Sequence, residues 1–257
     1  MLRVTLGHRK FRAGIGMTAL ALAGVLLFGQ LGRWQWHRAA EKRALEALFA
    51  AGAAASPIEP GTRPLAGLPR YTLLRLRGRY DGGHQFLLDN ISRDGAAGYE
   101  VLTPFELEDG RTLLVNRGWL PLANGRRDPL PDVSLAPPPA PAAGARALPP
   151  LEITGRLDEL PVTALRMGRV PPDDGPGWPK RCSFPTAAQL GAALGRPIEA
   201  RELLLAAGEP LGYRRDWHPG ASGFGPARHL AYALQWWGFA ALTLFLYVFM
   251  NLERRPP

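Results

Sequence analysis

Cysteine is nearly absent from this chain of 257 residues, because Cys182 is the only one. A single thiol excludes an internal disulfide, a CxxC redox pair and a metal site built from several thiolates. A phosphate-binding glycine loop is also missing from the sequence, and Asp173-Asp174-Gly175 has no histidine at metal-ligand spacing. Asp216, His218 and Ser222 lie near one another, but Gly220-Ala221-Ser222-Gly223-Phe224 lacks the G-x-S-x-G spacing of a hydrolase. We therefore expect a protein that is not an enzyme.

Acidic residues are outnumbered, with 22 Asp and Glu against 31 Lys and Arg, which gives a net charge of +9. Such an excess can indicate nucleic-acid binding, but arginine recurs along the whole chain, and no basic helix or RNA-binding aromatic signature is present. Attraction to the membrane surface explains the bias better. We expect membrane lipid as a partner and no nucleic acid.

Charge is absent from two long stretches. Residues 13–31 contain two polar side chains, Thr18 and Gln30. In residues 228–250 the charged side chains are Arg228 and, when it is protonated, His229. A helix of about 20 apolar residues crosses a bilayer core of roughly 30 Å. The first stretch is either a signal peptide or an anchor. Because no small-x-small cleavage site ends it, we predict an uncleaved transmembrane helix there and a second one at residues 228–250.

Basic residues flank both predicted spans. They lie in residues 1–12 before the first span and in residues 251–257 after the second, so the positive-inside rule puts both tails in the cytoplasm. Good helix formers extend the first helix over residues 32–55. Residues 56–227 then form the main domain, on the periplasmic side of a bacterial cytoplasmic (inner) membrane.

The main domain has strand periodicity. Apolar and polar residues alternate in residues 71–80, and turn residues such as Asp94-Gly95 and Asp109-Gly110 separate the segments that follow. We expect Pro104 at a sheet edge or bulge, and residues 126–150, rich in Pro and Ala, as an extended loop. The predicted strands are 71–80, 85–89, 99–107, 111–119, 151–157 and 202–206, with one short helix at 186–194. The predicted fold class is a membrane protein in which two transmembrane α-helices flank a β-rich α+β periplasmic domain with an antiparallel sheet.

One face of the second span carries aromatic and ligand-type side chains. His229, Tyr232 and Trp236 fall at i, i+3 and i+7, so an imidazole, a phenol and an indole share a face where the helix enters the membrane. A neutral imidazole is a common axial ligand of haem iron. Alternatively, His229 is an interfacial side chain bonded to water and Tyr232 belongs to the aromatic belt. The sequence pattern alone leaves these two interpretations about equal.

Further side chains near the same headgroup level could complete a haem site. Arg33, Arg38 and Arg228 could pair with the propionates. His37 could supply a second axial ligand if the two helices pack together, although a single histidine at an interface is more often only a polar side chain.

Four sequence blocks, taken in order, resemble the signature blocks of the surfeit locus protein 1 family. The blocks are Trp34-Gln35 with Arg38 and Lys42, Asp89-Asn90 through Arg93-Asp94-Gly95 to Gly98-Tyr99-Glu100-Val101-Leu102-Thr103-Pro104, Val115-Asn116-Arg117-Gly118-Trp119, and His229-x-x-Tyr232-Ala233-x-Gln235-Trp236. The two-span layout is similar as well. The insertion rich in Pro and Ala after Arg127 is not part of the family pattern.

The resemblance implies an assembly factor for cytochrome c oxidase that binds haem a with His229 as the iron ligand. It implies the catalytic subunit of that oxidase and haem a synthase as partners. The alternative is a scaffold without a cofactor, whose periplasmic sheet docks to nascent oxidase subunits. The residues of the central block, Asn116-Arg117-Gly118-Trp119, fit a strand end with a glycine turn and a buried tryptophan, so we expect them to stabilise the sheet.

Overall fold

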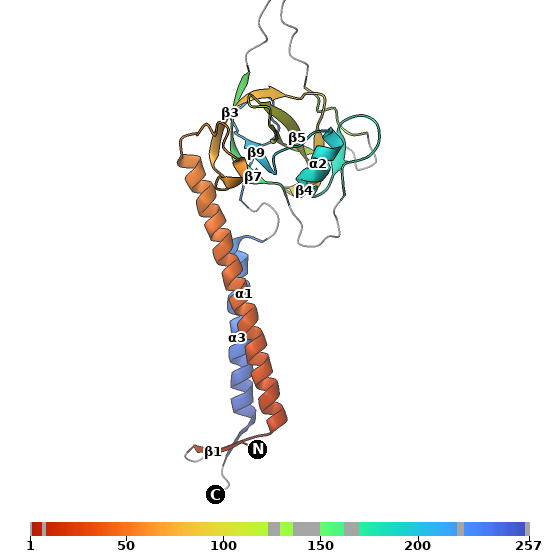
Figure 1. The fold of residues 1–257 in the computed structure, drawn as a ribbon. Helices are drawn as coiled ribbons and strands as arrows, with labels where there is room; N and C mark the ends of the chain where they lie inside the picture. Colours follow the sequence, from red (N-terminus) through yellow and green to blue (C-terminus); the bar gives the residue numbers. More distant parts are fainter. Residues whose placement is uncertain are drawn as a thin grey trace, which may run out of the picture. The chain divides into compact units, whose positions relative to one another are not determined.

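A computed structural model describes residues 2–6, 9–122, 129–135, 150–161, 170–219 and 224–254. The chain divides into two compact units (Figure 1). The helical unit is Met1–Ala47 with His218–Pro257, and the sheet domain is Leu48–Trp217. Most of the expected Pro/Ala-rich loop at 126–150 lies outside the described residues, as does Ser222.

The helical unit is built on α1 (Ile15–Ala54) and α3 (Pro226–Met250). Both are long and apolar enough to cross a membrane. Their large apolar side chains, among them Leu26, Leu244 and Phe249, are mostly exposed, as lipid-facing side chains are. Helix α1 is one uninterrupted helix of 40 residues, which confirms that the first predicted span continues as a helix beyond its apolar part.

Small residues bring α1 and α3 close together. Gly32 and Ala39 of α1 are buried, and so is Ala233 of α3. A Cβ added to Gly32 would lie 2.3 Å from the indole nitrogen of Trp237, so only glycine allows this approach. Nearer the other end of the pair, the hydroxyl oxygens of Thr18 and Tyr247 are 2.8 Å apart. Close backbones and a few interhelical hydrogen bonds are the usual means of pairing helices in lipid.

Three short strands join the two ends of the helical unit. β2 (Arg9–Ala13) lies between β1 (Leu2–Leu6) and β10 (Leu252–Arg254), and both pairs are antiparallel. From the sequence these segments were predicted only as basic tails. The five residues of β1 do alternate between apolar and polar, but such a short stretch does not stand out, and no local pattern shows that β2 pairs with β10 at the opposite end of the chain.

The sheet domain holds one seven-stranded sheet in the order β3-β7-β9-β6-β5-β4-β8. An additional pairing between β3 and β5 closes five of its strands into a barrel. All six predicted strands and the helix are present. The elements are β3 (Leu73–Tyr80), β4 (Phe86–Arg93), β5 (Ala96–Leu107), β6 (Thr112–Pro121), β7 (Leu151–Glu159), β8 (Lys180–Cys182), α2 (Ala187–Leu194) and β9 (Arg201–Leu205).

The sheet is mixed rather than wholly antiparallel, because β4 pairs with β8 and β6 with β9 in parallel. The prediction of Pro104 at an edge or bulge is wrong. Pro104 lies inside β5 opposite Leu114, and the irregularity falls between Glu100 and Leu102. On the side of β5 away from β6, the pairing with β4 ends at Leu102 and the pairing with β3 begins at Phe105. Pro104 lies between the two, so no strand on that side needs the N–H that proline lacks.

Local signals set the turns and the helix ends as predicted. Asp94 and Gly95 both have positive φ values, 52° and 80°, in the two-residue turn from β4 to β5. Gly110 has φ 86° in the turn between β5 and β6. Thr186 begins α2 with a capping box to Gln189, and Gly195 ends it in the left-handed conformation.

Among the described residues, the core of the sheet domain has three parts: one inside the barrel, one between the sheet and α2, and one where Val133 packs against β4 and β5. Leu74, Phe105 and Leu203 belong to the first part, and Phe86 and Leu190 belong to the second. The residues of α1 from Leu48 on belong to this domain. The ring of Phe49 meets Tyr71 edge-on at 5.1 Å, and the Arg156 guanidinium lies 4.0 Å from the centre of the Phe49 ring.

Candidate functional site

His229 is the fourth residue of α3, at the end of its first turn, and its half-buried ring contacts α1. Its Nδ1 atom is 2.6 Å from Oε1 of Gln35, a residue 194 positions earlier in the chain. Gln35 belongs to the first family block, but its sequence position alone indicates no role for it. Only the pairing of the two helices shows that it meets His229.

An aromatic ring outside the helix brings His229 and Tyr232 into one cluster. The ring of Phe224 lies 6.2 Å from that of His229 and 6.1 Å from that of Tyr232, and the Arg228 guanidinium lies 4.6 Å from the Phe224 ring. Sequence reasoning missed Phe224. Phe224 lies two residues before Pro226, the first residue of α3. A hydrophobic side chain at this position often packs back on the first turns of the helix that follows.

Trp236 lies apart from this cluster. Its ring stacks on Phe28 of α1 with centroids 5.8 Å apart, and it meets Phe239 edge-on at 5.7 Å. Trp236 therefore packs between the two helices, two turns along α3 from His229.

The structure does not bring His37 to the side of α1 that meets α3. That side carries Gly32, Gln35 and Ala39. His37 is two residues beyond Gln35, which is a rotation of about 200° on an α-helix, and its side chain is exposed.

The three arginines predicted as propionate partners differ in their surroundings. Arg228 belongs to the Phe224 cluster. Arg33 and Arg38 are exposed on α1, and Arg38 pairs with Glu41 at 2.6 Å. Of the three arginines, Arg228 is thus the one that contacts the Phe224 ring, which His229 contacts as well.

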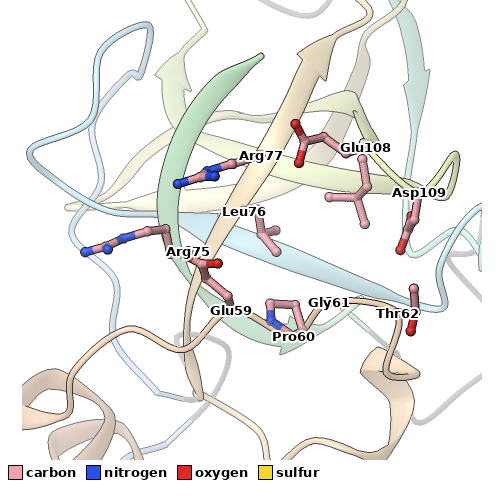
Figure 2. A pocket seen from close by; sticks show the side chains of 10 residues that line it. Glu59, Pro60, Gly61, Thr62, Arg75, Leu76, Arg77, Glu108 and Asp109 are labelled. Carbon is pink, nitrogen blue, oxygen red and sulfur yellow. The ribbon is translucent and has the colours of Figure 1, made fainter. Parts of the chain in front are cut away.

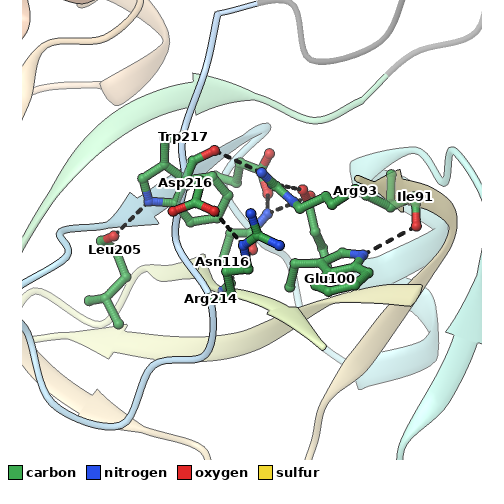
Figure 3. Close-up of polar contacts among 11 residues, drawn as sticks. Ile91, Arg93, Glu100, Asn116, Leu205, Arg214, Asp216 and Trp217 are labelled. Atoms are coloured by element: carbon green, nitrogen blue, oxygen red, sulfur yellow. Dashed lines mark hydrogen bonds and ion pairs between the residues drawn. The ribbon is translucent and has the colours of Figure 1, made fainter. Parts of the chain in front are cut away.

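The sheet domain contains a second constellation, a buried polar network in which an amide links two carboxyl groups (Figure 3). Nδ2 of Asn116 donates to Glu100 at 2.9 Å and to Glu202 at 3.2 Å. Arg93 donates to the other carboxylate oxygen of Glu100 at 2.8 Å. Burial, followed by the nearby charge of Glu100, raises the pKa of Glu202 well above its ordinary value, so Glu202 favours its neutral form.

The same region of the sheet domain holds the segment 211–217 against β6. The backbone N–H of Trp119 donates to the carbonyl of Arg214 at 2.8 Å, and Arg93 donates to the carbonyl of Asp216 at 2.7 Å. Gly118, at φ +115°, permits the contact because a Cβ there would lie 2.7 Å from the carbonyl oxygen of Arg214. The indole of Trp217 donates to the carbonyl of Leu205 at 2.8 Å.

These contacts confirm the buried tryptophan predicted for the central block and support a stabilising role for it. Trp119 is buried and its indole donates to the carbonyl of Ile91 at 3.2 Å. Arg117 is also buried and donates to the carbonyl groups of Leu211 and Val133. Desolvation lowers the pKa of Arg117. Contrary to the prediction of a strand end, β6 continues through this block to Pro121.

A cavity of about 460 Å³ lies beside β3 (Figure 2). Arg75 and Arg77 at its rim both pair with Glu152, at 3.4 and 3.1 Å. No residue predicted for the site lines it. Within the part of the chain that the structure describes, no group of three or more His, Cys, Asp or Glu could hold a metal ion. Burial raises the pKa of the Cys182 thiol to about 12, so this cysteine packs in the core as a neutral thiol.

Comparison with known proteins assigns the chain to a family. The model of the SURF1 family matches residues 22–241, which include most of both helices and the whole sheet domain. A SURF1-like protein of Monosiga brevicollis is 30% identical over 250 residues, covering 91% of this chain and 86% of the relative. A SURF1-like protein of Dictyostelium discoideum is 33% identical over 105 residues, covering 37% and 38% of the two chains. The chain therefore belongs to the SURF1 family, the surfeit locus protein 1 family of oxidase assembly factors.

Proposed function

We propose that this protein binds haem a at His229 and assists its insertion into the catalytic subunit of cytochrome c oxidase, with haem a synthase as the donor. Family membership supports a role in oxidase assembly. The observation that carries the haem step is the surroundings of His229. Its half-buried imidazole lies at the start of an apolar helix, beside an aromatic ring and a cation.

The side chains present fit haem a as a cargo. His229 supplies an imidazole ligand, and the rings of Phe224 and Tyr232 supply flat apolar surface. The Arg228 guanidinium supplies a charge for a propionate. The exposed apolar side chains of α3, such as Leu234, would offer lipid-facing surface for the hydrophobic tail of haem a. One strong ligand suits a cargo that must leave again.

The charge distribution supports a topology for this task. The protein spans a bacterial cytoplasmic membrane twice, with both termini in the cytoplasm and the sheet domain in the periplasm. Arg9, Lys10 and Arg12 precede the first span, and Arg254 and Arg255 follow the second. His229, close to the start of α3, then lies near the periplasmic surface of the membrane.

The test is the absorption spectrum and the extracted pigment of protein purified from cells that make haem a. Wild-type protein is expected to carry haem a, and His229→Ala to lose at least nine tenths of it while still inserting into the membrane and folding. His37→Ala is the matched control, because it removes an exposed imidazole from the far side of α1 and should leave the haem content unchanged.

Colourless wild-type protein, from cells shown to contain haem a, would contradict the proposal. In that case the remaining interpretation is the scaffold without a cofactor, which predicts that His229→Ala is silent in oxidase assembly. Substitutions on the surface of the sheet domain would then be the ones that impair assembly.

A further inference from the structure

We propose that Gln35 is a positioning residue, which holds the His229 ring with its proton on Nδ1 and so leaves Nε2 as the atom that binds iron. This inference rests on the proposed function, because it names how the same site is prepared for its ligand. The other members of the site belong to α3 or directly precede that helix, whereas Gln35 belongs to α1.

The argument starts from the atoms in contact. Oε1 of a glutamine amide can only accept a hydrogen bond, and it lies 2.6 Å from Nδ1 of His229. Nδ1 must therefore carry the proton. A neutral imidazole has one N–H, so Nε2 keeps the lone pair that binds a metal ion. Metal-binding histidines commonly donate their second ring N–H to an oxygen in this way, which fixes both the tautomer and the ring orientation.

Packing of the helices keeps Gln35 in place. Gly32 and Ala39, one turn before and one turn after it on α1, are buried, and Ala233, one turn after His229 on α3, is fully buried. These small residues let the helix axes approach closely enough for the glutamine side chain to span the gap. In a medium with little water the hydrogen bond is stronger than in solution.

Two substitutions separate a hydrogen-bonding role from simple packing. Gln35→Leu keeps the approximate volume and removes the acceptor, so haem a affinity should fall about 10–100-fold, the usual effect of losing the partner of a metal-binding histidine. Gln35→Glu keeps an acceptor and makes it stronger. It should preserve the affinity and lower the reduction potential of the bound haem, because a carboxylate increases the electron donation of the imidazole.

A packing role predicts the reverse pattern, with Gln35→Leu tolerated and Gln35→Glu harmful. Gln30→Leu is the matched control, since Gln30 is an exposed glutamine on the same helix. It should change neither affinity nor potential.

A second measurement needs no haem. The ¹⁵N NMR shifts of the histidine ring nitrogens report the tautomer, and the His229 signal is identified by its disappearance in His229→Ala. The wild-type protein and Gln30→Leu should show the proton on Nδ1. Gln35→Leu should show a mixture of tautomers, provided that circular dichroism finds its helix content unchanged.

The outcomes distinguish the two proposals. If the wild type binds haem a and His229→Ala does not, but Gln35→Leu keeps wild-type affinity, potential and tautomer, the Gln35 inference is overturned and the proposed function stands. If no variant binds haem a, the proposed function fails. In that case the tautomer measurement on the haem-free protein still tests whether Gln35 orients His229. A proton on Nε2 in the wild type would overturn the Gln35 inference as well.

Discussion

The buried polar network of the sheet domain and the candidate site of the helical unit differ in how their polar side chains are held. In the sheet domain, buried Asn116, Glu100 and Glu202 form hydrogen bonds with one another. In the helical unit, the His229 ring has a partner on one nitrogen, Gln35, and is only half buried. A network of mutually satisfied groups stabilises a fold, whereas a side chain held at one end is available to bind a ligand. This difference is why we place the functional site on the helices.

Removing the amide that links the two buried carboxyl groups should give the largest effect. Asn116→Leu removes a hydrogen-bond partner from three buried groups, the carboxyl groups of Glu100 and Glu202 and the N–H of Gly118, and each buried polar group left without a partner costs about 1–3 kcal/mol. Urea unfolding of the sheet domain, followed by tryptophan fluorescence, measures the loss. Ser92→Ala, at an exposed strand position, should change the free energy of unfolding by less than about 0.5 kcal/mol.

Gly118 tests whether the segment 211–217 is held as tightly as its contacts indicate. Gly118→Ala adds a Cβ at 2.7 Å from the Arg214 carbonyl oxygen in addition to unfavourable φ, and should cost about 2–4 kcal/mol. Gly110→Ala is the matched control. Its φ of +86° is similarly unfavourable, but nothing lies within 4 Å of the added Cβ, so the cost should be about 1 kcal/mol. Equal losses in the two variants would show that this close approach does not matter.

In the helical unit the corresponding test is Gly32→Leu, which places a side chain where the Trp237 indole now lies. Pairing of α1 and α3 is monitored by a disulfide between cysteines placed at Gly24 and Thr243, which are neighbours across the helix pair, in a Cys182→Ala background. Gly32→Leu should reduce the cross-linked fraction several-fold. Gly29→Leu should leave it unchanged, because nothing lies within 4 Å of a Cβ at Gly29.

The pH dependence of stability should give a smaller but diagnostic effect. The pKa of Glu202 is raised in the folded protein above its ordinary value of 4.5, so the folded state holds a proton that the unfolded state releases. Its contribution is fully present below pH 4.5 and is lost as the pH rises towards the folded pKa, by up to about 1.4 kcal/mol per pH unit. Glu202→Gln should flatten this slope in urea unfolding between pH 4.5 and 7. An unchanged slope would mean that Glu202 is ionised in the folded protein.

The smallest effect is expected at the exposed pair of Arg38 and Glu41. Arg38→Ala removes a surface ion pair and should change the free energy of unfolding by less than about 1 kcal/mol. In a haem titration it should lower affinity less than Arg228→Ala does, because only Arg228 belongs to the Phe224 cluster. If Arg38→Ala lowers the haem affinity more than Arg228→Ala does, the propionate partner is Arg38 on α1 and not Arg228 on α3.

Several features of the fold followed from local patterns. Uncharged apolar stretches located α1 and α3, alternation located β3, and Asp94-Gly95 located a two-residue turn with positive φ at both positions. The short strand β8 was missed, because its three residues are too few to show a period and prolines and glycines precede them. The partner of the His229 ring was missed for a different reason, since Gln35 lies 194 residues away.

The sequence by itself determined two apolar helices, a strand-rich domain between them and a ligand-type histidine at the start of the second helix. Each of these depends on residues close together in the chain, where period, length and turn chemistry act directly. Only the tertiary structure decided that the barrel closes between β3 and β5, that Asn116 links Glu100 to Glu202, and that Gln35 rather than His37 meets His229. Those pairings depend on which faces of distant segments pack together, and small residues such as Gly32 and Gly118 set how closely they approach.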